Sequence, residues 1–178
     1  MASTTAQPPV AVAAEPFDSP DAARLLGLAM AELQARYGPG PHDVHHDVGE
    51  DPDRTDKRHS PLTAEEFGPP GGTFLVARVG GRAVGCVGLR QLDPGVAEVK
   101  RLYVEPELRR RGVARALMAE LEHAAPLLGH HHLVLETGGL QPEAVALYRT
   151  SGWTPISSYM GPPRHEHSVY FEKRLEER

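Results

Sequence analysis

The sequence predicts an α/β (α+β) fold in which helices flank a mixed, mostly antiparallel sheet of six to seven strands. Three observations support this fold class. Two short turns, 80–81 and 93–95, contain glycine and separate runs rich in β-branched and apolar residues. The pattern then changes to helical periodicity over 112–125. An apolar run at 132–137 follows, and a strand–helix–strand unit of this kind places its two strands parallel.

Length and charge limit the classes of protein to consider. With 178 residues, the chain is long enough for one domain, expected over 1–178, and its single cysteine, Cys86, excludes an internal disulfide. A net charge of -5 argues against general binding to nucleic acid or anionic membranes. No apolar run approaches the length of a membrane-spanning helix, and the Ala-rich start lacks the basic segment of a signal peptide. We therefore expect a cytoplasmic protein, either monomer or homodimer.

A capped helix is predicted near the start of the chain. Ser19 is suited to the N-cap, Pro20 to the first helical position, and Gly38 to the stop. The buried face of this helix is predicted to carry Leu25, Leu28 and Ala29. A weak strand is expected before it, over 9–15.

Two segments after this helix are predicted from their composition. The range 38–61 is almost entirely polar and is expected to be a long loop. Thr63 is then placed to cap one helical turn over 62–67.

The rest of the chain completes the sheet. The range 73–104 is predicted to be a three-stranded antiparallel meander. Its last strand, 97–104, and the later strand 132–137 are predicted to be the parallel pair of the sheet. A helix is expected from Pro142 to about Gly152. The last two strands are expected over 153–160 and 168–175.

An arginine-rich turn is the most unusual feature of this acidic chain. Six of its nineteen Lys and Arg residues lie within 99–118, and three consecutive arginines precede Gly112 at the start of a helix. A turn that collects several N–H groups at a helix N-terminus forms an anion site, and glycine allows close approach of the backbone to a ligand. The alternative is a solvated basic turn on a surface helix. The spacing fits neither the Walker nor the Rossmann phosphate motif.

The turn resembles motif A of the GNAT superfamily of N-acetyltransferases, which reads Arg or Gln, two residues, Gly, one residue, and Gly or Ala. Arg109, Gly112 and Ala114 match it, and 104–106 resembles the V-x-P segment that precedes it. The stretch "LETGGLQPEAVALYRTSGW" resembles the second block of the family, and the similarity covers about 73–175. The chain departs from many relatives in having Gln141 in place of Asn and Ala114 in place of a second glycine.

This resemblance implies the GNAT fold and binding of acetyl-CoA as co-substrate, without a metal. The amides of 110–115 would bind the pyrophosphate, and backbone groups of Leu102 and Val104 would bind the pantetheine arm and the acetyl carbonyl. The cofactor-binding residues that the resemblance implies are Leu102, Tyr103, Val104, Arg109, Arg110, Arg111, Gly112, Val113, Ala114, Arg115, Gln141 and Tyr148.

The resemblance also implies a reaction, in which an amine attacks the thioester directly in a ternary complex. Tyr148, at the family's A-x-x-L-Y position, would be the acid for the departing thiolate, although a core aromatic residue would fit the same helical pattern. Glu98 and Glu136 are the two candidates for the base, with Glu98 slightly preferred, and either could instead be structural or act through water. Glu98 is expected to share a strand face with Lys100, Leu102 and Val104. The acceptor amine stays open, and a non-catalytic acyl-CoA-binding or sensing module is the alternative function.

Metal binding is not expected from the histidine clusters at 42–47 and 130–132. Neither has the helical H-x-x-x-H spacing or a matching cysteine set. Cys86, between apolar residues, is predicted to be a buried strand residue.

Overall fold

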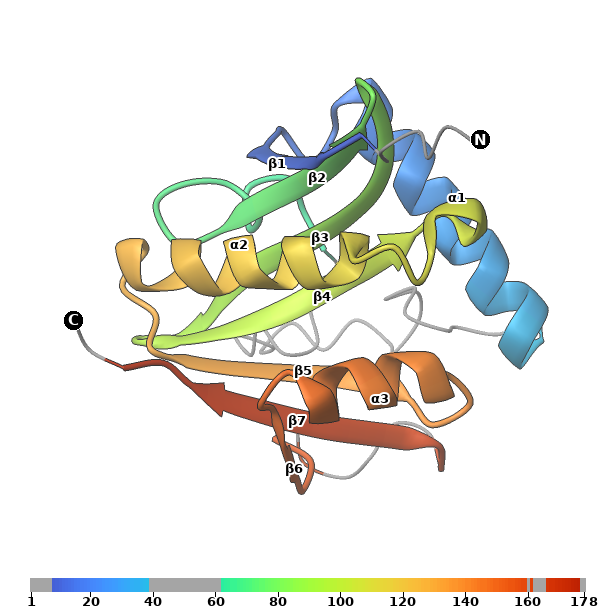
Figure 1. The fold of residues 1–178 in the computed structure, drawn as a ribbon. Coiled ribbons are helices and arrows are strands. Elements are labelled where there is room, and N and C mark those ends of the chain that lie inside the picture. Colours follow the sequence, from blue (N-terminus) through green and yellow to red (C-terminus); the bar gives the residue numbers. More distant parts are fainter. Residues whose placement is uncertain (1–7, 39–61, 160, 162–165, 177–178) are drawn as a thin grey trace, which may run out of the picture.

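The computed structural model describes residues 8–38, 62–159, 161 and 166–176 (Figure 1). Within these ranges the chain forms seven strands, three α-helices and a short 3-10 helix. In chain order the elements are β1 (Val10–Ala14), α1 (Pro20–Tyr37), β2 (Thr73–Val79), β3 (Arg82–Asp93), β4 (Val96–Val104), η2 (Pro106–Leu108), α2 (Val113–Leu127), β5 (His132–Gly138), α3 (Pro142–Thr150), β6 (Thr154–Ile156) and β7 (Ser168–Arg174).

The strands form one sheet in the order β1-β2-β3-β4-β5-β7-β6. All neighbours are antiparallel except β4 and β5, which confirms the predicted fold class and its parallel pair. The β4–β5 pairing runs only from Val96 opposite His132 to Val99 opposite Leu135. Beyond Leu135 the two strands are no longer paired, and Figure 1 shows their ribbons diverging. The fork between them lies beside the start of α2.

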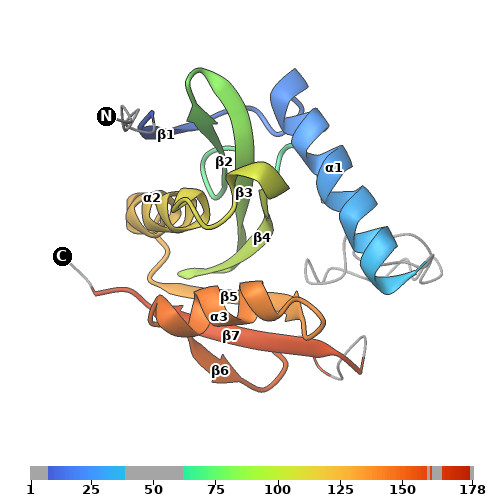
Figure 2. The same ribbon diagram turned by 45° about the vertical axis from the view of Figure 1, so that its right-hand side comes forward.

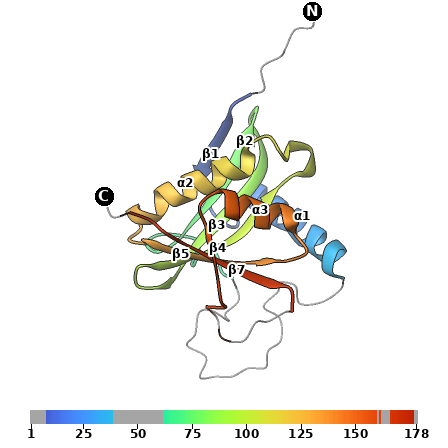
Figure 3. The same cartoon turned by 60° about the horizontal axis from the view of Figure 1, so that its bottom comes forward.

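Helices cover both faces of the sheet. On one face, Leu117 and Leu121 of α2 and Tyr148 of α3 belong to a core cluster that includes Leu133 and Leu135 of β5. A second cluster contains Ala22, Leu25 and Ala29 of α1 together with Phe67, Phe74, Val76, Ala83, Cys86 and Tyr103. Figure 2 shows α1 and α2 on opposite sides of β4, and Figure 3 shows α2 and α3 crossing over the strands. We refer below to the α1 face and the α2 face of the sheet.

The first helix forms as predicted, with one change in its buried face. Ser19 is its N-cap and accepts a hydrogen bond from the Ala22 N–H at 3.2 Å, while Gly38 ends it with φ 82°. Leu28, however, is 41% exposed. At about 100° per residue, Leu28 falls well to one side of the stripe that Leu25 and Ala29 define, so it lies outside the core.

A β-bulge in β4 makes the strand faces differ from those predicted. Two residues of β4 lie where the opposite strand has one, because Tyr103 pairs with Cys86 whereas Lys100 pairs with Gly88. Arg101 in the bulge has φ 62°. The bulge reverses the side-chain alternation, so Glu98 and Lys100 keep the α1 face. The prediction that Leu102 and Val104 share that face is wrong, because both pack into the α2-face cluster.

Two other predicted elements are shorter than expected. Thr63 begins a hydrogen-bonded turn, in which the Glu66 N–H donates to the Thr63 carbonyl at 3.2 Å, but no helix forms there. The strand predicted over 153–160 is limited to β6. The predicted loop lies outside the described residues from 39 onward. None of the described helices combines the length and apolar character needed to cross a membrane.

Candidate active site

The turn between η2 and α2 leaves a row of backbone N–H groups without partners. Arg110 and Gly112 both have left-handed backbone angles, with φ 60° and 83°. The first hydrogen bond of α2 runs from Ala116 N–H to the Gly112 carbonyl at 2.9 Å. No residue in the described part of the chain accepts a hydrogen bond from the N–H groups of 110–115. Such a row at a helix N-terminus forms an anion cradle.

The arginines of this turn divide into two groups. The Nε of Arg109 donates to the Val104 carbonyl at 2.9 Å, and its guanidinium pairs with Glu32 of α1 and lies 5.9 Å from the centre of the Tyr103 ring. Arg109 therefore holds the end of β4 and the first helix together. The three other arginines are exposed and form no ion pair with the described residues; these are Arg110, Arg111 and Arg115. Their guanidinium groups are free to meet an anion.

The end of α1 lies against the other side of the fork. Arg36 donates to the Leu140 carbonyl at 3.2 Å and pairs with Glu143 at 2.6 Å. Gln141, the N-cap residue of α3, places its Nε2 3.4 Å from the Tyr37 hydroxyl. A Cβ at Gly138 would lie only 1.8 Å from that hydroxyl, so any other residue there would force the Tyr37 ring to move.

Tyr148 lies in the α2-face cluster, with 5% of its surface exposed. Its ring contacts Trp153 and Phe171 at centroid distances of 5.8 and 5.6 Å. Its hydroxyl forms no hydrogen bond with the described residues. Burial raises the pKa of Tyr148 above its ordinary value, so the hydroxyl keeps its proton at neutral pH.

Glu98 occupies the α1 face at the base of the fork and is fully buried. One carboxylate oxygen accepts from Arg90 Nε at 2.9 Å. The other accepts from the Tyr159 hydroxyl at 2.6 Å and lies 3.1 Å from Lys100 Nζ. Burial by itself would raise the pKa of Glu98, but the charges of Lys100 and Arg90 and the hydrogen bonds outweigh it, so this pKa lies below its usual range.

Glu136 is the first residue of β5 beyond the segment that pairs with β4. It is half-buried, and its Oε1 accepts from Ser168 Oγ at 2.6 Å and from the Tyr170 hydroxyl at 3.5 Å. No cationic side chain among the described residues pairs with it. Glu98 and Glu136 thus share the α1 face near the fork, whereas Tyr148 packs on the α2 face.

Sequence reasoning missed several of these neighbours. Arg90 and Tyr159 stand eight and sixty-one positions from Glu98, and no spacing rule links them to it. The alternation in 168–175 does predict that Ser168 and Tyr170 share one strand face, but only the pairing of Glu136 with Tyr170 in the structure shows that this is the face of Glu136.

The histidines form no metal site in the described part of the chain, because no group of three metal-ligating side chains is found there. His130 is buried, with its Nε2 2.9 Å from the Gly71 carbonyl, and His132 pairs with Glu172 at 2.8 Å. The cluster at 42–47 lies outside the described residues. Cys86 is buried as predicted, and burial raises its thiol pKa to about 12.

Known proteins share this sequence pattern and this fold. A curated relative, the IAA acetyltransferase of Azospirillum brasilense, is 36% identical over 118 residues, which cover 64% of this chain and 75% of that protein. Matches to an uncharacterized N-acetyltransferase of Schizosaccharomyces pombe and to human N-acetyltransferase 8 cover 61% and 44% of those proteins.

Solved structures extend the fold similarity over nearly the whole chain. One from Klebsiella pneumoniae, provisionally assigned as an acyl-CoA N-acyltransferase, has a TM-score of 0.72 at 24% identity and covers 94% of this chain and 98% of that one. A GNAT family acetyltransferase from Elizabethkingia anophelis with acetyl-CoA bound has a TM-score of 0.56 at 14% identity, covering 93% and 98%. A family model described as the acetyltransferase (GNAT) family matches residues 29–153, more than half of the chain. The chain therefore belongs to the GNAT family of acetyltransferases.

Proposed function

We propose that this protein transfers an acetyl group from acetyl-CoA to a primary amine, by direct attack of the amine in a ternary complex. The observation that carries the proposal is the run of unpartnered N–H groups at 110–115 beside three exposed, unpaired arginines. A pyrophosphate presents several anionic oxygens to such a cradle, and the arginine side chains add charge at its rim. The structural relative with acetyl-CoA bound supports the same ligand.

The residues around the fork fit the remainder of this co-substrate. Val113 and Ala114 lie in the first turn of α2, and Gln141 caps α3 on the other side of the fork. The segment 102–104 of β4 extends beyond the pairing with β5, so its backbone groups, apart from the Val104 carbonyl that accepts from Arg109, are available to the pantetheine arm. Because its side chain is committed to Val104 and Glu32, we assign Arg109 to positioning this strand end.

The chemistry requires a base for the amine and an acid for the thiolate. As the C–N bond forms and the C–S bond breaks, the amine loses a proton and the sulfur gains one. Tyr148 is proposed as the acid, because its hydroxyl is protonated at neutral pH and donates to no described residue, so its proton is available to the thiolate. The carboxylates on the opposite face are the candidates for the amine side.

Of these two carboxylates, we propose Glu136 as the base. Glu98 is held between two cations, and its lowered pKa makes it a weak acceptor of protons. Glu136 has no cationic partner among the described residues, and its Oε2 accepts no hydrogen bond from them. Glu98 is then a fixed charge that orders the α1 face.

Two measurements test this function. Acetyl-CoA should raise the thermal unfolding temperature, because it binds only the folded protein, and CoA thiol should be released in the presence of a suitable amine. Absence of binding at millimolar acetyl-CoA would contradict the proposal. Tight binding with no thiol release across a broad amine panel would instead support an acyl-CoA-sensing module.

A further inference from the structure

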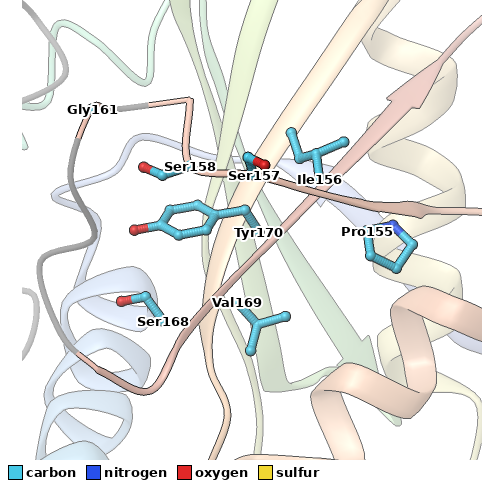
Figure 4. Close-up of a pocket in the computed structure, with 8 residues that line it drawn as sticks. All are labelled: Pro155, Ile156, Ser157, Ser158, Gly161, Ser168, Val169 and Tyr170. Atoms are coloured by element: carbon cyan, nitrogen blue, oxygen red, sulfur yellow. The ribbon is translucent and has the colours of Figure 1, made fainter.

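An open pocket of about 500 Å³ lies between β6, β7 and the segment that follows β6 (Figure 4). Its lining residues are Pro155, Ile156, Ser157, Ser158, Gly161, Ser168, Val169 and Tyr170. We infer that this pocket binds the acceptor, and that it selects a primary amine with an uncharged, partly apolar body over an amine that carries a carboxylate. This inference rests on the proposed acetyl transfer.

The position of the pocket connects it to the site at the fork. Ser168 and Tyr170, which line the pocket, both donate hydrogen bonds to Glu136. Tyr159 packs edge-on against Tyr170 at a centroid distance of 5.6 Å and bonds to Glu98. Figure 4 shows the Tyr170 ring and the Ser168 hydroxyl extending to the same side of β7. A ligand that contacts the hydroxyl of Ser168 or Tyr170 in this pocket is therefore separated from the proposed base by that hydroxyl alone.

The hydroxyl groups of this wall are arranged to receive N–H donors. Because Ser168 gives its proton to Glu136, the lone pairs of its oxygen remain to accept a hydrogen bond from an amine. Glu136 has no counter-charge among the described residues, and a cationic amine would supply one. The amine could then lose its proton to Glu136, directly or through the Ser168 hydroxyl, before it attacks the acetyl group.

The remaining lining determines what else the acceptor carries. Pro155, Ile156 and Val169 offer apolar surface, and none of the described lining residues is cationic. Among the described residues, a carboxylate on the acceptor would lose its hydration without gaining a partner, and it would meet the negative charge of Glu136. Two described cations on this face, Arg90 and Lys100, are already paired with Glu98.

The test compares three acceptors that share one aromatic body. Phenethylamine, phenylalaninamide and phenylalanine are assayed as acceptors by CoA release with the full-length protein. Phenylalaninamide matches phenylalanine in size but lacks its negative charge. We expect kcat/KM for both neutral-bodied amines to exceed that for phenylalanine by at least about tenfold. Equal or better turnover of phenylalanine would overturn the inference while leaving the acetyltransferase function intact.

Variants of the pocket wall provide the second arm. Ser168→Ala should raise KM for phenethylamine by about fivefold or more, and Ser168→Thr should restore it, because threonine keeps the hydroxyl. Ser151→Ala, a serine at the end of α3 outside the lining, is the matched control. An unchanged KM in a folded Ser168→Ala variant contradicts the inference. If no amine of any kind releases CoA, the acetyl transfer itself fails, and this inference fails with it.

Discussion

The Tyr159 hydroxyl donates a hydrogen bond to Glu98 Oε1 at 2.6 Å, across sixty-one positions of the chain. This bond ties the segment after β6 to the buried ionic cluster on β3 and β4. Because Tyr159 also packs against Tyr170, it links that cluster to the wall of the pocket. The charge of Glu98 and the shape of the pocket are therefore physically connected.

Removing this hydroxyl should weaken the protein measurably. Tyr159→Phe keeps the ring against Tyr170 but deletes a hydrogen bond to a buried carboxylate, so the free energy of unfolding should fall by about 1.5–3 kcal/mol. Denaturant unfolding measures this change. Tyr170→Phe loses only a 3.5 Å bond to the half-buried Glu136, and it should cost clearly less. Equal losses in the two variants would show that the hydrogen bond to Glu98 contributes no more to the free energy of unfolding than the bond to Glu136.

Glu98 should make stability depend on pH in the acid range. Its folded pKa lies below the unfolded value of about 4.3, so its ionised form stabilises the folded state above that pH, and this contribution is lost as pH falls through the folded pKa. Glu98→Gln should lower the free energy of unfolding by about 3 kcal/mol at pH 7, and the difference from wild type should shrink below about pH 4. Glu120→Gln, at an exposed carboxylate on α2, is the control and should show neither effect. A constant difference down to pH 2 would contradict the assignment.

The sequence predicted the three-stranded meander and most element boundaries because local turn and cap signals act alone there. Gly80 and Gly81, with φ 58° and 83°, form the turn their type favours, and the cap at Ser19 needs no tertiary partner. The bulge at Arg101 had no such signal, since arginine does not favour a positive φ. Its position follows from the pairing of β3 with β4, which a single strand does not reveal.

The candidate site was predictable only where the family motif lies. The turn before Gly112 was recognised from its residue types, but the separate role of Arg109 depends on Glu32, which comes from a helix far away in the chain. The sequence also could not predict that Glu98 has charged partners whereas Glu136 has none among the described residues. Arg90 and Tyr159 reach Glu98 only through the sheet pairing and a later loop. Charge partners of this kind are set by the tertiary fold.

The division among the arginines predicts different losses on substitution. Replacing Arg110, Arg111 and Arg115 together by alanine should weaken acetyl-CoA binding by about tenfold at low salt and flatten its salt dependence, with unfolding nearly unchanged. Arg109→Ala should instead lower stability, because it removes the contacts to Val104 and Glu32. Calorimetry at several salt concentrations separates these effects. If the triple variant keeps the salt dependence of wild type, the exposed arginines do not meet the anion.

Gly112 should be required for two separable reasons. Its φ of 83° disfavours a β-branched residue, so Gly112→Val should cost about 1–2 kcal/mol of stability as well as acetyl-CoA affinity. A Cβ there would meet no protein atom within 4 Å, so any further loss of binding reflects obstruction of the ligand. Gly112→Asn tolerates the left-handed conformation better and should bind poorly while remaining stable. Full acetyl-CoA affinity in the Asn variant would show that the glycine serves only the backbone.

Tyr148→Phe tests the acid on the other face of the fork. The substitution keeps the ring contacts with Trp153 and Phe171, and it leaves no partner unsatisfied, because the hydroxyl bonds to no described residue. Stability and acetyl-CoA affinity should therefore change little. The kcat with an amine that the wild type acetylates should fall by about 10- to 1000-fold, the range typical of a general acid. Single-turnover measurements with saturating amine distinguish slow chemistry from slow release. A wild-type rate of chemistry in the Phe variant would assign Tyr148 to the core alone, since only the hydroxyl has been removed.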